Sequence, residues 1–467
     1  MNRVLGQNRG LAVFLSLALY CCLASACNEK DIPEQSAQDI ATPGSDVPGL
    51  DIQNPSGHDS WTDTTSPKPD VNIAQQLEPA DSCTNPKWIV YSPPPELPPL
   101  QPELLGDIVY CSEDITMTSA YISNWLNALD YDTTFSGRDT QTWLIAYRTG
   151  RSSGEEGIGT ARVYVPAGPP PSSFVVIAHA TVGLADYCAP SLNEYYLNYL
   201  VLPMLARGYA VIAPDYAGLG SIGVQGYGNN RDQAYSVLDA SRAMLKLFPQ
   251  FGSQTPFVVV GHSQGGGAAI ASQALESSYG SGGALKGIVA FAPGYNFVDR
   301  TIWPSLHPFP LGYITYAVAM IYYADFANIM GEEHGGYPFA EDIQNTLVFA
   351  LENLCLPTLM EQTAHLAPDL SDLLSDDFKT ELASCQETGV CSQHIEAYMD
   401  RCSDNVLMTD PEGAPMLILS GTSDLHVSPE AISCLNNWLN ASQTEADIYL
   451  IENEDHVSIT TVRIGFV

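Results

Sequence analysis

Continuous apolar runs punctuate the chain from about residue 140 onward, and they carry the first structural prediction. Several contain no alternating polar residue and are rich in β-branched side chains: residues 174–178, 209–213, 257–260, 287–291 and 416–419. Runs of this kind belong to strands that are buried on both faces, as in a parallel sheet. Residues 143–147 and 161–165 predict two further strands with a glycine-rich turn between them.

Helical patterns separate these predicted strands. Residues 234–247, for example, carry apolar side chains at helical spacing. Alternating strands and helices predict an α/β fold, with a mostly parallel sheet that is flanked by helices. Ligands of such sheets bind beyond the carboxyl ends of the strands, so we expect the chemistry of the protein to lie there.

One long segment interrupts the alternation. Residues 295–410 lie between two predicted core strands, which assigns residues 83–294 and 411–467 to the α/β core. A helical cap over a pocket, an extra structural domain and a lid that touches membranes are three competing interpretations. We favour the helical cap insertion, because the segment leaves and rejoins the sheet at the edge where ligands bind.

The N-terminal segment has the pattern of a targeting signal. Arg3 and Arg9 accompany an apolar run at residues 11–19, which is too short to span a bilayer. A small-x-small cleavage site, Ala-Ser-Ala, ends immediately before Cys27, and this predicts a signal peptide at residues 1–26. The same stretch is similar to a bacterial lipobox, in which the cysteine after the cleaved bond is lipidated. Lipidation of Cys27 and simple secretion both remain open.

The segment after Cys27 has the composition of a tether. Residues 27–82 are rich in Pro, Ser, Asp, Thr and Gln and contain few large apolar residues. Such a segment cannot bury enough apolar surface to offset the entropy of ordering, so we expect it to be a disordered acidic tether. Behind a lipid anchor on Cys27, the tether would hold the folded body clear of a membrane.

The cysteine count bears on the choice between lipidation and simple secretion. Of the eleven cysteines, Cys21 and Cys22 precede the cleavage site and Cys27 would carry the lipid, which leaves eight. An even set in an exported protein suits disulfide pairing, whereas simple secretion leaves one odd thiol. The parity therefore favours a lipoprotein that faces the periplasm or the cell exterior. We expect Cys83 to pair with Cys111, because both flank the entry to the folded part.

The charge of the chain excludes one class of partner. Lys and Arg number 18 against 53 Asp and Glu, which gives a formal net charge of −35. Nucleic-acid binding needs clustered Lys and Arg for the phosphates, so we expect no nucleic-acid partner. The same charge disfavours adsorption to anionic lipid surfaces and fits a highly soluble surface.

The most specific chemical motif lies at the end of the strand predicted at residues 257–260. The strand runs directly into Gly261-His262-Ser263-Gln264-Gly265, and a helical stretch of small residues follows. This is G-x-S-x-G at a strand–turn–helix junction, where a tight turn lifts the serine hydroxyl clear of the sheet. The flanking glycines leave room for that turn, and the helix N-terminus favours developing negative charge. The pattern predicts that Ser263 is a nucleophile.

A serine nucleophile needs a base that is held by an acid. In folds that carry this strand–turn–helix motif, the acid follows the serine in the chain and the histidine comes last. Both lie on loops at the same edge of the sheet as the serine. Asp424 follows the strand at residues 416–419, and His456 follows the strand at residues 447–451. The weaker rivals for the base are His426, on the same loop as the acid, and His262, inside the turn. The predicted catalytic triad is therefore Ser263, Asp424 and His456.

An oxyanion hole should complete the site, because acyl transfer develops negative charge on the carbonyl oxygen. One donor should be the backbone N–H of Gln264, directly after the nucleophile. The second should come from the loop after the third predicted strand, where Thr181 and Val182 are the candidates. The remaining histidines lack the spacing of metal ligands, and no dinucleotide fingerprint follows the first strands, so we expect neither metal nor cofactor.

Several motifs beyond the G-x-S-x-G turn resemble the secretory lipase branch of the α/β-hydrolase superfamily. They are Tyr-Ser-Pro-Pro-Pro at 91–95, Gly-Asp at 106–107, the string at 181–191, Pro-Asp-Tyr-Ala-Gly-Leu-Gly at 214–220 and Leu-Asp-Ala at 238–240. Together with the nucleophile turn they cover most of residues 88–460.

The resemblance implies the α/β-hydrolase fold with a helical cap in the position of residues 295–410. It also implies hydrolysis of carboxylic esters, including acylglycerols in lipid degradation, by a triad carried onto Ser263, Asp424 and His456. A serine peptidase or an acyltransferase could use the same triad. A catalytically inactive, surface-tethered binding protein that kept the fold is the alternative from another class.

Overall fold

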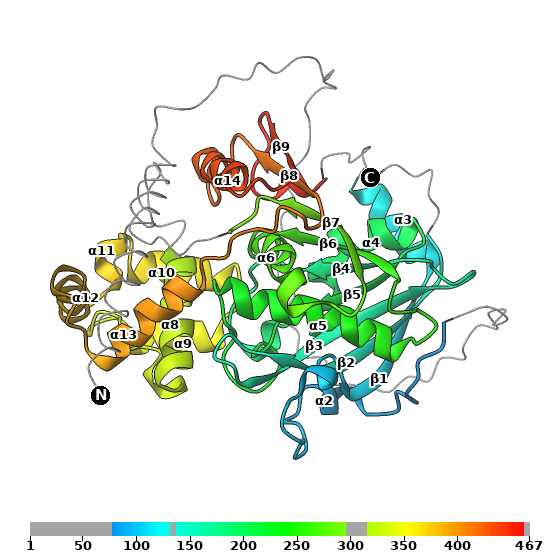
Figure 1. The fold of residues 1–467 in the computed structure, drawn as a ribbon, viewed down its shortest axis with the longest axis horizontal. Helices are drawn as coiled ribbons and strands as arrows, with labels where there is room; N and C mark the ends of the chain where they lie inside the picture. Colours follow the sequence, from blue (N-terminus) through cyan, green and yellow to red (C-terminus); the bar gives the residue numbers. More distant parts are fainter. Residues whose placement is uncertain (1–76, 130, 132–136, 296–314, 462–467) are drawn as a thin grey trace, which may run out of the picture.

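The computed structural model describes residues 77–129, 131, 137–295 and 315–461 (Figure 1). The signal peptide, Cys27 and nearly all of the tether therefore lie outside the described residues, and so does part of the predicted cap. Within the described residues, the strands form one nine-stranded sheet in the order β1-β2-β3-β5-β4-β6-β7-β8-β9. Their bounds are β1 (Ile108–Met117), β2 (Thr140–Gly150), β3 (Glu156–Pro166), β4 (Phe174–Ala178), β5 (Ala210–Pro214), β6 (Pro256–His262), β7 (Ala284–Phe291), β8 (Met416–Gly421) and β9 (Ala446–Ile451).

The sheet is antiparallel at one edge and parallel through the rest. The pairs β1–β2, β2–β3 and β3–β5 are antiparallel, and all later pairs are parallel. Each continuous apolar run predicted from the sequence lies in one of the parallel strands, and both faces of these strands are buried. In β4, for example, Phe174 and Val176 belong to the core on one face, and Val175 and Ile177 belong to the core on the other. The prediction of a mostly parallel α/β sheet is confirmed.

Helices cover both faces of the sheet (Figure 1). The helices α5 (Asn230–Leu247), α6 (Gln264–Tyr279) and α14 (Pro429–Ala441) bury apolar side chains against one face. The helices α3 (Ser119–Ala128) and α4 (Asn198–Ala206) cover part of the other. A shorter helix, α2 (Lys87–Val90), packs beside β1. Helix α5 begins where the Asn229 side chain accepts the N–H of Asp232, which is an N-cap.

Strand β1 was not predicted, because its side chains do not form an apolar run. Ser112, Glu113 and Asp114 follow one another in its middle, and its register with β2 shifts at two points. An edge strand of an antiparallel pair needs to bury only one face, so its pattern is weak. As a consequence, the loop with Thr181 and Val182 follows the fourth strand of the chain, β4, and not the third.

The described part of the segment between β7 and β8 consists of helices joined by short loops. Its helices, α8 to α13, lie together beside the sheet, at the left of Figure 1. They bury a separate apolar core, in which Phe326, Phe378 and Tyr398 pack ring against ring. Their bounds are α8 (Thr315–Met330), α9 (Gln344–Asn353), α10 (Thr358–Leu366), α11 (Leu370–Leu373), α12 (Asp376–Thr388) and α13 (Gln393–Asp404).

A buried ion network joins these helices to the α/β core. Arg401 on α13 donates to Asp325 on α8 at 2.8 Å and to the hydroxyl of Ser152 at 3.1 Å, and it lies 3.7 Å from Asp232 on α5. Arg151 donates to the same Asp232 carboxylate at 3.0 Å. Burial alone would raise the pKa of Asp232, but Arg151 and Arg401 hold it below its ordinary value. Asp232 thus stays charged between the two arginines.

Three disulfides connect described cysteines: Cys83–Cys111, Cys188–Cys355 and Cys385–Cys391. The first is the pair expected from the sequence, and it ties the entry segment to β1. Within the described ranges, no helix combines the length and the apolar character that crossing a lipid bilayer requires.

Replacing Arg401 tests the junction between the insertion and the core. Arg401→Ala leaves two buried carboxylates with one cation fewer, and breaking a buried pair typically costs about 3–5 kcal/mol. We expect a loss of that size in the free energy of unfolding, measured by urea denaturation. The matched control is Lys379→Ala, because Lys379 pairs with Asp376 on the surface of α12 and should leave the midpoint unchanged. Equal midpoints for both variants would contradict the role of the network.

Candidate active site

Ser263 occupies the turn between β6 and α6 in a backbone conformation that few residues adopt. Its φ is 56° and its ψ is −116°, which costs about 1–3 kcal/mol in strain. The surrounding backbone holds it there. The N–H of Ser263 donates to the carbonyl of Phe291 at 2.9 Å, and its own carbonyl accepts from Gly267 at 3.1 Å and from Gly294 at 2.9 Å. The turn predicted from the sequence is therefore bonded to the end of β7 and the residues after it.

The glycines on either side of Ser263 are required by space. A Cβ at Gly261 would lie 2.0 Å from the carbonyl oxygen of Gly265, and a Cβ at Gly265 would lie 1.9 Å from the carbonyl oxygen of Ala178. No side chain fits at such distances. The turn is thus packed against the carboxyl end of β4.

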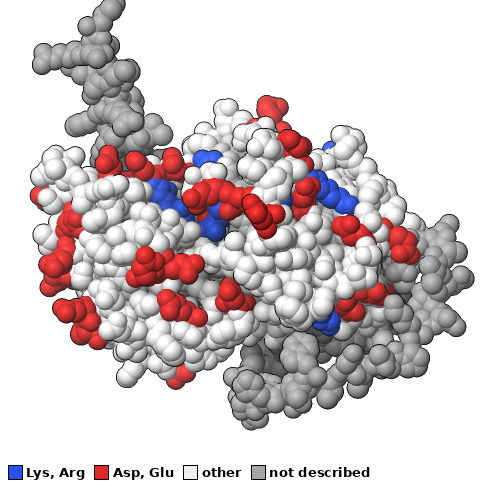
Figure 2. All heavy atoms as spheres, turned by 90° about the horizontal axis from the view of Figure 1, so that it is seen from below, with Lys and Arg blue, Asp and Glu red and all other residues white. Residues whose placement is uncertain are grey.

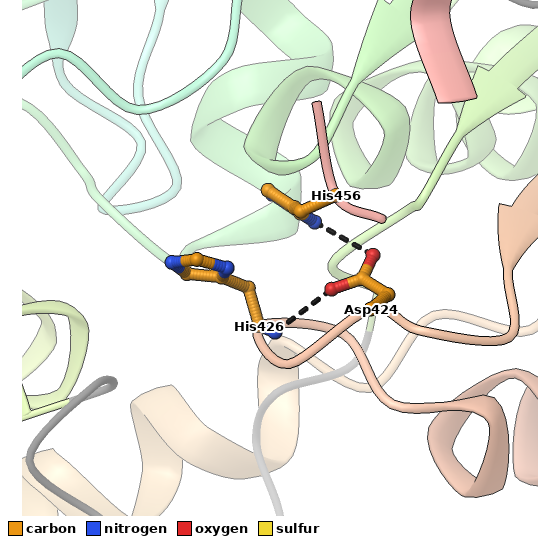
Figure 3. A group of neighbouring side chains, drawn as sticks. All are labelled: Asp424, His426 and His456. Carbon is orange, nitrogen blue, oxygen red and sulfur yellow. Dashed lines mark hydrogen bonds and ion pairs between the residues drawn. The ribbon is translucent and has the colours of Figure 1, made fainter. Parts of the chain in front are cut away.

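Asp424 is placed by the loop after β8 and is almost fully buried, with 1% of its surface exposed. One carboxylate oxygen accepts the backbone N–H groups of His426 and Val427, each at 2.8 Å. The other oxygen lies 2.8 Å from Nδ1 of His456. Figure 3 shows this division, with one oxygen directed at the loop backbone and the other at the ring. The loop therefore fixes the orientation of the carboxylate before it meets the histidine.

His456 follows β9 and lies between the acid and the serine. Its Nε2 is 2.9 Å from Oγ of Ser263, and its Nδ1 is the atom that contacts Asp424. The three side chains that the sequence singled out are thus brought into one hydrogen-bonded row. They come from loops at the carboxyl ends of β6, β8 and β9, which all lie at one edge of the sheet.

The two rival histidines take supporting positions. His262 Nε2 donates to the backbone carbonyl of His456 at 2.7 Å, and His262 Nδ1 accepts from the hydroxyl of Tyr199 at 3.0 Å. The ring of His426 stacks on the ring of His456, with centroids 4.7 Å apart. The roles of His262 and Tyr199 were not predicted from the sequence. The available signal was the position of His262 directly before the nucleophile, where its side chain must lie near the site.

The predicted oxyanion donors lie on the two elements that meet at Gly265. Gln264 is the first residue of α6, so its backbone N–H has no partner within the helix. Thr181 and Val182 belong to the loop after β4. The last residue of β4, Ala178, has its carbonyl against Gly265. The Oγ of Thr181 is hydrogen-bonded to the hydroxyl of Tyr227 at 2.8 Å.

One group of described residues has the composition of a metal site: Asp424, His426 and His456 offer ligand atoms within 4.8 Å of one another. Both ring nitrogens of His456 already take part in the contacts with Asp424 and Ser263. The geometry of these contacts is that of a proton relay from a hydroxyl to an imidazole oriented by a carboxylate.

The buried position of His262 predicts a pH dependence of stability. Burial lowers the pKa of His262 from 6.5 to about 3, so below pH 6.5 the unfolded chain binds a proton that the folded protein does not. His262 therefore lowers stability as the pH falls from 6.5 towards 3. In His262→Gln we expect this decline to be shallower by up to about 1.4 kcal/mol per pH unit, measured by denaturant unfolding across that range. Replacing the exposed His334 should leave the slope unchanged, and an unchanged slope in His262→Gln would contradict the assignment.

Comparisons with known proteins agree with this fold. Residues 192–301 match the family model described as secretory lipase. No curated protein sequence matches the chain. Among solved structures, the closed state of Candida antarctica lipase A is similar, at 15% identity and a TM-score of 0.57, over 76% of this chain and 78% of that one.

Two bacterial structures are also similar over 76% of this chain. The rice cell wall degrading esterase LipA from Xanthomonas oryzae has 17% identity, a TM-score of 0.58 and 93% of its length covered. A putative hydrolase from Legionella pneumophila has 20% identity, a TM-score of 0.59 and 94% covered. At these identities the structural likeness shows the fold. The resemblance found in the sequence is thus confirmed: the chain has the α/β-hydrolase fold, one segment matches the secretory lipase family, and these findings support its assignment as a carboxylic ester hydrolase.

Proposed function

We propose that the chain is an exported serine hydrolase that cleaves carboxylic esters through Ser263, His456 and Asp424 and an acyl-enzyme intermediate. The observation that carries the proposal is the position of His456. Its two ring nitrogens lie 2.9 Å from the Ser263 hydroxyl and 2.8 Å from the Asp424 carboxylate. A carboxylate on one side of an imidazole orients the ring and stabilises its charge, so that the other nitrogen can accept a hydroxyl proton.

In the first half of the proposed reaction, Oγ of Ser263 attacks the ester carbonyl carbon while its proton passes to Nε2 of His456. Asp424 stabilises the imidazolium ion that forms. The negative charge on the former carbonyl oxygen is accepted by the backbone N–H of Gln264 and by that of Thr181 or Val182. Collapse of the tetrahedral intermediate breaks the ester C–O bond, and His456 returns its proton to the departing alcohol. The acyl group is then bonded to Ser263.

The second half repeats these steps with water. His456 takes a proton from the water as its oxygen attacks the acyl-enzyme carbonyl. The second tetrahedral intermediate collapses by breaking the bond to Oγ of Ser263, which recovers the proton from His456. A carboxylic acid leaves, and the enzyme is restored.

The charge of the protein favours neutral esters as substrates. Acidic side chains are spread over the face shown in Figure 2, with few Lys and Arg among them, and the net charge is −35. Such a surface repels anionic substrates, whereas an uncharged ester or acylglycerol approaches without that cost.

The helical insertion reaches the site and is proposed as a cap over the substrate. Burial first, and then the neighbouring Tyr227 and Asp424, raise the pKa of Tyr316 above its ordinary value. Tyr316, at the start of α8, also belongs to one buried apolar cluster with Tyr227 and with Leu184 of the loop after β4. A helix in this position shields the reacting groups from water and sets which acyl chains fit.

Export is proposed from the chemistry of the cysteines. The disulfides that join Cys83 to Cys111 and Cys188 to Cys355 form and persist in oxidising compartments. The secretory lipase match and the disulfides fit an exported protein. We extend this to a lipoprotein that is anchored through Cys27, which lies outside the described residues.

Triad variants test the catalytic proposal. Wild type should react with a fluorophosphonate probe and Ser263→Ala should not, because the probe modifies an activated serine. His456→Ala should lower kcat by about 10⁴-fold or more at nearly unchanged thermal stability, measured with p-nitrophenyl esters. His334→Ala, which replaces an exposed histidine, should retain full activity. An active His456→Ala would refute the assignment of the base.

The same assays separate the other functions. A series of p-nitrophenyl esters from short to long chains, together with an amide, distinguishes an esterase, a lipase and a peptidase. Transfer of the acyl group to an added alcohol in preference to water would identify an acyltransferase. A wild-type protein that neither reacts with the probe nor turns over any ester would be a binding protein.

The lipid anchor is tested at Cys27. Cys27→Ser should move the protein from the membrane fraction to the soluble fraction, because one thioether-linked lipid group would be lost. Fractionation of cells that express wild type or the variant measures this, with Cys22→Ser as the control. Membrane association that persists in Cys27→Ser contradicts a lipoprotein.

A further inference from the structure

The loop after β4 contacts the helical insertion through its backbone. We call residues 179–188 the oxyanion loop, and residues 354–356, between α9 and α10, the bridging segment. The N–H of Leu356 donates to the carbonyl of Val182 at 3.0 Å. Gly183 and Cys355 form an isolated antiparallel β-bridge at the same place. The insertion thus adds a short strand-like edge to the loop that holds the candidate oxyanion donors.

A disulfide fastens the same two segments. Cys188, at the end of the oxyanion loop, is bonded to Cys355, which lies 167 residues later in the chain. The Cys188 side chain is buried and packs with Val182 and Leu219, and Cys355 packs against this cluster. The hydrogen bond, the β-bridge and the disulfide therefore all act on Cys355 and Leu356, two adjacent residues of the bridging segment.

Gly183 shows how closely the two segments approach. Its φ is +121°, and a Cβ there would lie 2.9 Å from the carbonyl oxygen of Leu354 and 3.2 Å from Sγ of Cys188. A side chain at this position would force the bridging segment away from the loop. The loop and the bridging segment are therefore in direct backbone contact at Gly183.

Contacts with the α/β core hold the rest of the loop. Directly before the loop, the carbonyl of Ala178 lies against Gly265 of the nucleophile turn. In its middle, Thr181 is hydrogen-bonded to the hydroxyl of Tyr227, and burial raises the pKa of that hydroxyl to about 12. Only the side that faces the insertion depends on residues outside the α/β core.

We propose that Cys355 and Leu356 of the insertion are positioning residues for the oxyanion hole, and that the Cys188–Cys355 disulfide holds them in place. The inference rests on the proposed function, because it assigns a role within the same acyl transfer. The bridging segment stabilises the loop conformation in which the N–H of Thr181 or Val182 faces the reacting carbonyl oxygen. The insertion thereby contributes to the rate of the chemical step as well as covering the site.

The magnitude of the effect follows from the cost of a misplaced donor. Loss of one oxyanion-hole donor lowers kcat by about 10²- to 10³-fold. When the loop is released on one side, the donor N–H still occupies its catalytic position for part of the time. We therefore expect a smaller loss of kcat, of about 10- to 100-fold. Substrate binding before the chemical step does not use the oxyanion contact fully, so KM should change by less than about threefold.

The test uses the full chain with both cysteines replaced, Cys188→Ser with Cys355→Ser. Its kcat towards a p-nitrophenyl ester should fall by about 10- to 100-fold at nearly constant KM. Affinity for a trifluoromethyl ketone should fall by a similar factor, because its adduct with the serine carries an oxyanion in the same hole. The variant should still react with a fluorophosphonate probe, which shows that it is folded and that Ser263 remains activated.

The matched control removes the other disulfide of the insertion, Cys385→Ser with Cys391→Ser. This bond joins the end of α12 to the segment before α13, six residues later within the insertion, so kcat and inhibitor affinity should stay at wild-type values. Gly183→Ala keeps the Cys188–Cys355 bond but pushes Leu354 away, and it should lower kcat in the same way. It keeps the test decisive if the double variant does not fold.

Each result decides the inference. Wild-type kcat and wild-type ketone affinity in both the cysteine variant and Gly183→Ala would overturn it. Equal losses of kcat in the two disulfide variants would also overturn it, because the effect would then be general destabilisation. Failure of the proposed function is a separate outcome, in which wild type itself is inactive and Ser263 is not labelled.

Discussion

The absence of space around the nucleophile turn is the constraint on which the site depends. A Cβ at Gly265 would lie 1.9 Å from the carbonyl of Ala178, and a Cβ at Gly267 would lie 2.2 Å from the carbonyl of Gly294. The start of α6 is therefore pressed between the ends of β4 and β7. This packing holds Ser263 in its strained conformation and brings the loop after β4 to the same point. The acid and base loops then need only to reach this point from β8 and β9.

The parts of this arrangement that were predictable from the sequence are those with local signals. Strands buried on both faces appear as apolar runs, and the nucleophile turn is marked by its own glycines. Asp424 and His456 could be chosen because each follows a strand in the expected chain order. The supporting roles of His262 and Tyr199 had no such signal, since they depend on which backbone groups meet across the fold. Strand β1 was not predicted, because an edge strand can contain consecutive polar residues and then shows no apolar run.

Contacts between segments that are far apart in the chain could not be predicted from the sequence either. Cys188 and Cys355 are separated by 167 residues, and nothing near either of them identifies the partner. Arg401 and Asp232 likewise meet only because α13 packs on the start of α5. Cys83 and Cys111 differ, because they are 28 residues apart and both belong to the entry segment, so position alone suggested the pair.

The way the insertion is attached limits how this protein can change during evolution. Its helices leave after β7 and return before β8, so in connectivity they are an exchangeable module that could be replaced without altering any strand. Two links between the insertion and the oxyanion loop restrict such a replacement. They are the backbone hydrogen bond from Leu356 to Val182 and the disulfide between Cys188 and Cys355. A transplanted module would have to bring its own partner for the oxyanion loop, or the loop would have to be exchanged with it. Diversification of substrate range should therefore proceed by substitutions within the existing helices more readily than by wholesale replacement.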